Sequence, residues 1–328
     1  MKYGKLGKSD IEISKVVLGC MTFSGGANWG DQDERDSIDT IRAALDSGIT
    51  AFDTAEGYAA GLTETILGKA LGADRQKVSI FSKFSLANSS YDKVIESCEA
   101  SLKRLGTDYI DLYMIHWPSR EVPFEETTRA LEKLVADGKV RAIGVSNFGK
   151  EDLTKILPLT NVVADQLAYN LFFRGIEYSI KPLCEENGVG VLTYSSLAQG
   201  LLSGKYKTAD EFPAGRARTK YFSSSREFVR HGGEGCEEEV FGAIQKISKI
   251  CDEIGEPMAN VALAWSIAQP GISGVIAGGR TAEQARINAE AGNLELSKDV
   301  IAELTSITEG IKAHFGDDAD PWMDGRIR

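Results

Sequence analysis

Short apolar runs alternate with amphipathic stretches along most of the chain, and this alternation limits the fold more than any other feature. Three early runs succeed one another at intervals of roughly thirty residues, the length of one strand-plus-helix unit. We predict strands over residues 15–20, 49–53, 78–83, 109–116, 140–146, 162–168, 188–194 and 271–277. We predict helices over residues 34–47, 63–71, 91–105, 124–137 and 176–186. Glycine follows several of these helices, as is typical of a helix C-terminus.

Eight strands alternating with helices predict either a (β/α)8 TIM barrel or a large doubly wound sheet. The barrel is favoured because the count is eight and no Pro/Ser-rich linker divides the chain. We therefore expect a single α/β domain over residues 1–328. An N-terminal β-hairpin is predicted to plug the bottom of the barrel. Two irregular segments, residues 198–235 and 316–328, are predicted to be long loops at the C-terminal face.

Composition and charge exclude several classes of function. The net charge is −11 and the Lys and Arg residues are scattered, so a nucleic-acid partner is not expected. Five cysteines without a CxxC pair favour a reducing compartment over a disulfide framework. With three histidines and no Cys/His cluster, no metal site is predicted.

The N-terminal residues contain no apolar signal-peptide core, and no run reaches the ~18 apolar residues that a membrane-spanning helix needs. The sequence therefore predicts a soluble, cytoplasmic protein without a membrane partner.

Four chemically active residues lie at or just beyond the ends of three successive predicted strands: Asp53, Tyr58, Lys83 and His116. Adjacent parallel strands lie only ~5 Å apart, so these side chains are expected to converge. A phenol has a pKa near ~10, and an ammonium group held by a carboxylate is expected to lower that pKa. Such a group can protonate a carbonyl oxygen but contains no nucleophile. The electrons must then come from a cofactor.

A nucleotide cofactor would need an unusual binding mode, because the chain contains neither a G-x-G-x-x-G fingerprint nor a P-loop. Polar and glycine residues at the ends of the later strands are the candidates. Barrels of this kind commonly bind phosphate through the loops after strands seven and eight. The candidate positions are Ser146, Asn147, Gln166, Tyr194, Ser195, Ser196, Gly278, Gly279 and Arg280.

Seven segments occur in an order that resembles the aldo-keto reductase superfamily: FDTAEGY, IFSK, DLYMIHWP, GVSNF, QLAYN, YSSLAQGLLSGKY and IAGGRTAEQARIN. The details are similar to the bacterial branch related to potassium-channel β subunits and to stress and inositol-catabolism reductases. The resemblance implies a (β/α)8 barrel that binds NADP(H) and reduces carbonyl groups to alcohols.

The resemblance also implies roles for individual residues. Tyr58 would be the proton donor of a catalytic tetrad completed by Asp53, Lys83 and His116. Ser146, Asn147 and Gln166 would hold the nicotinamide, on which Tyr194 would stack. Further cofactor-binding residues are implied after the first two strands, in a segment after strand seven that would bind the pyrophosphate, and after strand eight, where the adenosine end would bind. They are Met21, Thr22, Asp53, Ser195, Leu197, Gly200, Leu202, Gly278, Arg280, Gln284 and Asn288. Substrate would contact Phe23, Trp29, Trp117 and Trp322.

Alternatives remain open at this point. Asp53 and Lys83 taken alone could form a purely structural ion pair. The arginines of the 198–235 loop could clasp a cofactor, although the solvated alternative is favoured for most of them. Gly278 stands where eukaryotic relatives place a phosphate-binding lysine, so Arg280 carries the expected preference for NADP(H) over NAD(H).

A redox-sensing regulatory protein that binds NADP(H) with little turnover is the second functional hypothesis. A barrel that acts on sugar phosphates without a nicotinamide is the third. The partner is expected to be a small carbonyl compound. Its identity, the direction of the reaction and the oligomeric state are not predicted.

Overall fold

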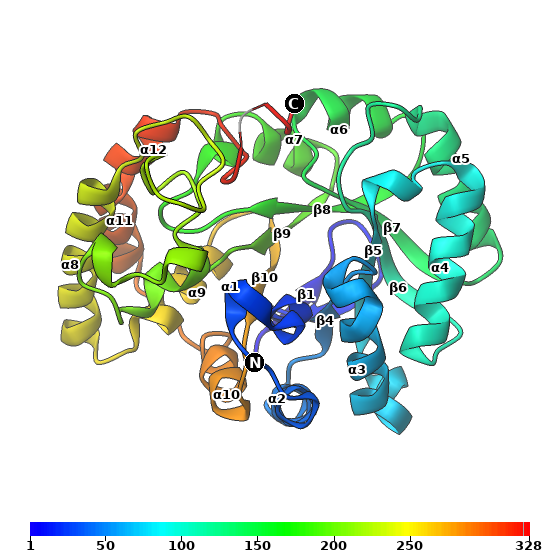
Figure 1. The fold of residues 1–328 in the computed structure, drawn as a ribbon, viewed down its shortest axis with the longest axis horizontal. Helices are drawn as coiled ribbons and strands as arrows, with labels where there is room; N and C mark the ends of the chain where they lie inside the picture. The colour runs from blue at the N-terminus through cyan, green and yellow to red at the C-terminus, as the bar shows by residue number, and fades with distance from the viewer. Residues whose placement is uncertain (324) are drawn as a thin grey trace.

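The computed structural model describes residues 1–323 and 325–328, and for residues 27 and 28 it describes the backbone only. Eight parallel strands form a closed barrel in the order β10-β3-β4-β5-β6-β7-β8-β9, with helices around it (Figure 1). The barrel strands are β3 (Val16–Gly19), β4 (Ala51–Asp53), β5 (Ser79–Phe84), β6 (Ile110–Ile115), β7 (Val140–Ser146), β8 (Val162–Ala168), β9 (Gly190–Tyr194) and β10 (Ile272–Gly278).

Helices follow the barrel strands in the chain, and others complete the outer layer. They are α1 (Gly26–Trp29), α2 (Glu34–Asp46), α3 (Leu62–Leu71), α4 (Tyr91–Leu105), α5 (Phe124–Ala136), α6 (Lys150–Ile156), α7 (Ile180–Glu186), α8 (Glu237–Ile254), α9 (Met258–Ile267), α10 (Ala282–Glu290), α11 (Lys298–Ile307) and α12 (Glu309–Phe315). The predicted (β/α)8 barrel is confirmed. Each predicted strand begins and ends within two residues of the observed one.

The N-terminal hairpin consists of β1 (Tyr3–Lys5) and β2 (Glu12–Ser14), which pair antiparallel. Its apolar side chains, Leu6, Ile11 and Ile13, are buried in one cluster with strand residues such as Phe81 and Leu112. The hairpin therefore closes the barrel end that lies opposite the carboxyl ends of the strands, as predicted.

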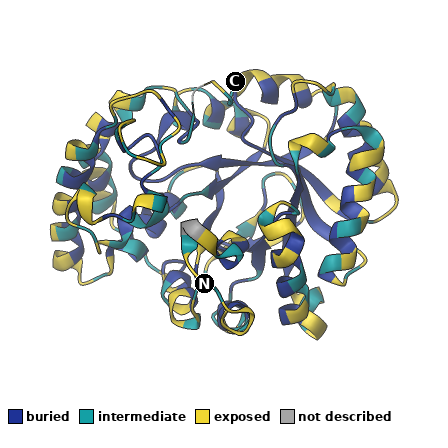
Figure 2. Cartoon of the chain, in the orientation of Figure 1, coloured by how far each residue is buried: buried dark blue, intermediate teal, exposed yellow. Residues whose placement is uncertain are grey.

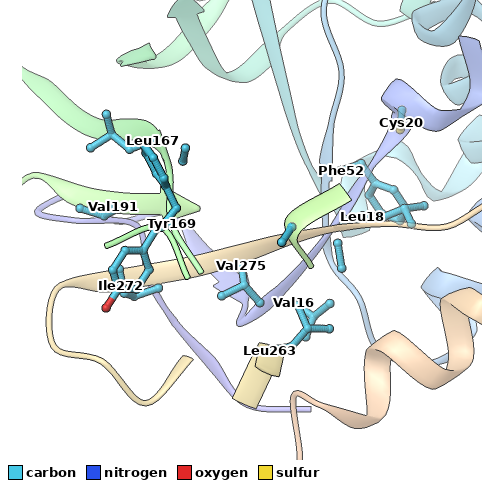
Figure 3. Close-up of a cluster of buried hydrophobic side chains, with 14 of the residues drawn as sticks. Val16, Leu18, Cys20, Phe52, Leu167, Tyr169, Val191, Leu263, Ile272 and Val275 are labelled. Atoms are coloured by element: carbon cyan, nitrogen blue, oxygen red, sulfur yellow. The ribbon is translucent and has the colours of Figure 1, made fainter. Parts of the chain in front are cut away.

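A second apolar cluster fills the space between the strands and the surrounding helices. Figure 2 shows the strands buried and the outward faces of the helices exposed. Leu18, Phe52, Leu167 and Leu263 are four of its buried members (Figure 3). Such burial on both faces is typical of parallel sheets and stabilises the protein by ~25 cal/mol for each Å² of apolar surface removed from water.

No helix among the described residues is long and apolar enough to cross a membrane.

The chain between β9 and α8 is a long connection that contains three 3₁₀ turns, η6 (Ala198–Ser203), η7 (Ala209–Glu211) and η8 (Ala214–Arg216). Its η8 turn contacts α1. Because α1 follows β3 and η8 follows β9, this contact bridges two loops at the carboxyl ends of the strands.

The C-terminal tail runs from α12 to α6 and ends against the loop before α6. The Asp152 N–H donates to the carbonyl oxygen of Arg328, and Arg120 donates to the carbonyl oxygen of Arg326. A Cβ at Gly149 would lie 2.2 Å from the Arg328 oxygen, so this contact requires glycine. The described end of the predicted irregular tail therefore contacts both the loop after β6 and α6.

Candidate functional site

Asp53 and Lys83 form a buried ion pair at the carboxyl ends of neighbouring strands. Asp53 is the last residue of β4, and Lys83 lies near the end of β5. The Lys83 Nζ donates to both Asp53 carboxylate oxygens and to the Thr54 carbonyl oxygen, each at 2.8 Å. Lys83 is 0% exposed and Asp53 3%. The Asp53 carboxylate therefore holds the positively charged Lys83 ammonium group inside the barrel mouth.

Tyr58 lies on the turn after β4, and its hydroxyl is 3.5 Å from the Lys83 Nζ. The Tyr58 ring meets the His116 ring edge-on, with ring centres 5.8 Å apart. Ala59 and Ala60 follow in the left-handed backbone region, with φ of 48° and 52°. The structure therefore brings the four predicted residues Asp53, Tyr58, Lys83 and His116 together around one point.

The electrostatic environment differs from expectation at Tyr58. Burial raises the pKa of the Tyr58 phenol, and the nearby Lys83 charge opposes this shift without reversing it. Burial acts to lower the pKa of Lys83, but the Asp53 carboxylate and the Tyr58 phenol outweigh burial and raise that pKa above its usual value. At neutral pH the site therefore holds a protonated phenol beside a charged ammonium group.

His116 follows β6, and its backbone N–H donates to the Phe84 carbonyl oxygen at 3.1 Å. Burial and the Lys83 charge lower the pKa of the His116 imidazole to about 3. The ring is therefore neutral at physiological pH. A neutral imidazole retains one N–H that can donate to a substrate oxygen.

The lowered His116 pKa predicts a pH-dependent stability. The unfolded imidazole binds a proton near pH 6.5 and the folded one does not, so the free energy of unfolding falls as the pH drops from 6.5 towards 3. We expect a loss of at most about 1.4 kcal/mol for each pH unit from this group. Urea unfolding at several pH values, with His116→Gln as the comparison, measures it. Parallel pH profiles for the two proteins would contradict the assignment.

A hydrogen-bonded wall of polar side chains joins the tetrad to the ends of β7, β8 and β9. Gln166 donates to Asp53 Oδ2 at 2.7 Å, and Ser146 donates to the Gln166 carbonyl oxygen at 3.0 Å. Asn147 has a φ of 62° and donates to the His116 carbonyl oxygen at 3.0 Å. The Tyr194 hydroxyl donates to Asn147 Oδ1 at 2.8 Å. These four predicted cofactor residues therefore lie directly beside the tetrad.

The segment after β9 contains several left-handed residues in close succession: Ser195, Ala198, Gln199 and Gly200, with φ values of 51°, 48°, 59° and 102°. Such backbone turns successive N–H groups towards one concave side, a common way to bind phosphate oxygens. The buried Gln199 Oε1 has no hydrogen-bond partner among the described residues. The predicted positions Leu197 and Leu202 belong to this turn, because the Leu202 N–H donates a hydrogen bond to the Leu197 carbonyl oxygen at 3.2 Å. The Leu202 side chain is in the core.

The turn after β10 gathers the remaining predicted cofactor residues. Thr22 donates to the Gly279 carbonyl oxygen at 2.8 Å, and Asn288 donates to the Gly278 carbonyl oxygen at 3.1 Å. Gln284 accepts from the Arg280 N–H at 2.9 Å. The predicted Met21 side chain is 41% exposed. Gly278, Gly279 and Arg280 precede α10, whose N-terminal end favours anions.

The guanidinium of Arg280 is oriented by the segment before α2. It donates to Gln32 Oε1 at 2.9 Å and to the Asp31 carbonyl oxygen. The Gln32 side chain in turn donates to the Arg280 carbonyl oxygen at 3.2 Å. This reciprocal pair positions the Arg280 fork at the edge of the site.

The four aromatic residues predicted to contact substrate occupy different environments. Trp117 and Trp322 are partly exposed, and Arg326 of the tail covers the Trp117 ring at 4.0 Å. Trp29 ends α1 and is partly exposed. Phe23 is 2% exposed and belongs to the outer apolar cluster. The structure therefore places Trp117 and Trp322 near the mouth and Phe23 in the core.

Two arginines outside the predicted site residues lie close to the site: Arg216, one of the loop arginines considered above, and Arg326 of the tail, which was not considered. The Arg216 Nη1 atom is 3.2 Å from the position of a Cβ built on Gly200, and its Nη2 donates to the Tyr206 hydroxyl. Arg326 reaches Trp117 from the tail. Most loop arginines were expected to be solvated, but the guanidinium of Arg216 packs against two aromatic rings, those of Tyr206 and Phe212. No local pattern distinguishes these arginines from surface ones.

Comparisons with known proteins agree on one family. The family model described as "Aldo/keto reductase family" matches residues 15–309. The chain is 35% identical to "Aldo-keto reductase YhdN" of Bacillus subtilis over 94% of both chains. It is 33% identical to the "NADH-specific methylglyoxal reductase" of Escherichia coli, with 95% of this chain and 100% of that protein covered. An aldo-keto reductase from Klebsiella pneumoniae, solved in complex with NADPH, is 28% identical, with coverage of 100% and 99% and a TM-score of 0.76.

Proposed function

Because the chain belongs to the aldo/keto reductase family, we propose that it reduces an aldehyde or ketone to an alcohol with NADP(H), using Tyr58 as the proton donor. The observation that carries this proposal is the approach of the Tyr58 hydroxyl to within 3.5 Å of a buried, carboxylate-held ammonium group. A sugar or an inositol-like compound is within the proposed substrate class.

The residues around the mouth suit a nicotinamide dinucleotide. The amide and hydroxyl groups of Ser146, Asn147 and Gln166 would hold the nicotinamide end beside the Tyr194 ring. The left-handed turn after β9, with its successive N–H groups, would receive the pyrophosphate, and Arg280 would hold the adenosine end. When bound, the reduced nicotinamide supplies the hydride that forms the new C–H bond.

The protein supplies the proton and the charge that make this reduction favourable. The Tyr58 hydroxyl donates its proton to the carbonyl oxygen as the alcohol forms. The positive charge of Lys83 stabilises the phenolate left behind, and Asp53 keeps Lys83 charged and in place. Neutral His116 donates its N–H to the carbonyl oxygen and so orients the substrate. Water reprotonates Tyr58 before the next turnover.

A panel of aldehydes and ketones tests the proposal directly. Each carbonyl compound is mixed with NADPH or with NADH, and loss of absorbance at the nicotinamide band gives kcat and KM. We expect steady turnover with at least one class of carbonyl. Tight NADP(H) binding with negligible turnover across the panel would instead support a redox-sensing regulatory role. Absence of any change in nicotinamide fluorescence on mixing would contradict both.

Relatives of this chain differ in the cofactor that they are named with, since one is named for NADH and a solved neighbour binds NADPH. In this chain we expect the preference for NADPH to depend on Arg280. A guanidinium suits the 2′-phosphate that distinguishes the two cofactors. We expect Arg280→Ala to raise the KM for NADPH by about 10- to 100-fold and that for NADH by less than about threefold. Arg35→Ala, an exposed arginine on α2, is the control. Equal losses with both cofactors would contradict this role of Arg280.

A further inference from the structure

Arg218, on the loop after η8, carries a charge that no described acidic residue neutralises. Its guanidinium lies over the Trp322 ring, with Cζ 5.1 Å from the ring centre. Its Nε is buried and has no hydrogen-bond partner among the described residues. Neither a hydrogen bond nor an ion pair to the described part of the chain involves this side chain. The residue as a whole is only half-buried, so an anion can reach the rest of its guanidinium.

The charged neighbour of Arg218 is a second cation. The pKa of Arg218 is lowered by burial and by the like charge of Arg230. This contrasts with Arg226 of the same loop, which forms ion pairs with Glu237 and Asp210. The molecule has 48 acidic residues and a net charge of −11, so carboxylates are not scarce. The lack of an acidic partner for Arg218 among the described residues therefore points to a functional demand rather than to a structural one.

The position of Arg218 relates it to the reacting centre. The loop that carries Arg218 is bonded to the tail, since the Lys220 N–H donates to the Pro321 carbonyl oxygen at 2.8 Å and Arg218 lies over the Trp322 ring. The Trp322 N–H donates to Asp320, which holds Arg326 over the Trp117 ring, next to His116. Arg218 is thus linked to the tetrad through the tail at the mouth of the barrel.

Two neighbouring arginines, Arg326 and Arg216, differ from Arg218 in what they contact. Arg326, which covers Trp117, is held by both carboxylate oxygens of Asp320 at 2.7 and 2.9 Å, so its charge is matched. Arg216, two residues before Arg218, lies at the left-handed turn proposed for the pyrophosphate. Unlike Arg326 and Arg216, Arg218 packs on the Trp322 ring and has a buried Nε without a hydrogen-bond partner among the described residues.

Resting on the function proposed above, we infer that the substrate is a carbonyl compound that also bears an oxyanion, a carboxylate or a phosphate, which Arg218 binds. The planar guanidinium fork suits both groups. Arg230 adds a second positive charge, and Trp322 and Trp117 provide the apolar walls between the oxyanion and the reacting carbonyl. Arg218 is a specificity residue and takes no part in the proton or hydride transfer.

Matched pairs of aldehydes test this inference. The first pair is 4-carboxybenzaldehyde and its methyl ester, and the second is glyceraldehyde 3-phosphate and glyceraldehyde. We expect kcat/KM to be at least about tenfold higher for the anionic member of at least one pair, and this excess to shrink as salt is added. The pair with the larger excess identifies the oxyanion as carboxylate or phosphate.

Substitution of the arginine assigns the effect to this site. We expect Arg218→Gln to lower kcat/KM for the anionic aldehyde by about 10- to 100-fold, mainly through KM, and for the neutral aldehyde by less than about twofold. Arg218→Lys should recover part of the loss. Arg129→Gln is the matched control, because it removes an exposed guanidinium over the Tyr91 ring of α4, on the outer layer. Thermal unfolding of each variant verifies that it is folded.

A binding measurement separates this inference from the proposed function. Quenching of tryptophan fluorescence by 4-(hydroxymethyl)benzoate and by its methyl ester, with NADP⁺ present, reports binding without turnover. Turnover of both aldehydes at equal rates, with Arg218→Gln acting equally on both, would overturn the inference and leave the proposed function standing. Binding of the carboxylate through Arg218 without reduction of any carbonyl would uphold the oxyanion site and overturn the reductase.

Discussion

The Tyr58→Phe variant is expected to lose about 1000-fold or more of its kcat while its Kd for NADP(H) changes by less than about twofold. Removal of one hydroxyl takes away the proton that the carbonyl oxygen needs. The ring itself, which meets His116 edge-on at 5.8 Å, remains in place. Steady-state kinetics on the best carbonyl of the panel and fluorescence titration of the cofactor measure the two quantities.

The control for this variant is Tyr178→Phe. Tyr178 is 50% exposed on the outer layer, and removal of its hydroxyl should leave kcat unchanged. A Tyr58→Phe protein that keeps a tenth or more of the wild-type kcat would overturn the assignment of Tyr58 as proton donor. Comparable loss in the control would indicate a general effect on stability instead.

Lys83→Met is expected to abolish turnover and to lower the free energy of unfolding by about 3–5 kcal/mol. The substitution leaves the Asp53 carboxylate, 3% exposed, without its principal counter-ion. It also removes the charge that stabilises the Tyr58 phenolate during proton transfer. Urea unfolding and steady-state kinetics measure the two effects.

A second substitution separates stability from chemistry at this pair. In Asp53→Asn/Lys83→Met no buried charge is left unmatched, so we expect most of the lost stability to return while turnover stays absent. Recovery of activity in the double variant would show that the ion pair is structural only. Unchanged stability in the single variant would show that water reaches Asp53.

Much of this fold was predictable from sequence because a closed parallel barrel repeats one pattern. Strands β7 (Val140–Ser146) and β8 (Val162–Ala168) were predicted to the residue, since each is a mostly apolar run that follows a polar residue. The tetrad followed from the same pattern. Parallel neighbours end at one edge, so residues after successive strands meet there.

What could not be predicted depends on packing between distant segments. The expected lowering of the Tyr58 pKa was wrong in direction, because the extent of burial is a property of the folded mouth and not of the order of residues. Phe23 illustrates the same point, since it lies in the turn after β3 and its side chain is buried in the core. The contacts of Arg326, Arg328 and Arg218 have no periodic signal in the sequence, because irregular segments are shaped by what they contact.

Closure of the barrel depends on the pairing of β3 with β10, which joins Val16 to Val275. During synthesis the ribosome must release most of the polypeptide before the first strand meets its final neighbour. Until then β3 and whichever strand was made last present unpaired edges, which are sites for aggregation. Contacts at such long separation also slow folding. Heterologous production should therefore give more native protein when translation is slow and when chaperones that shield nascent sheet edges are abundant.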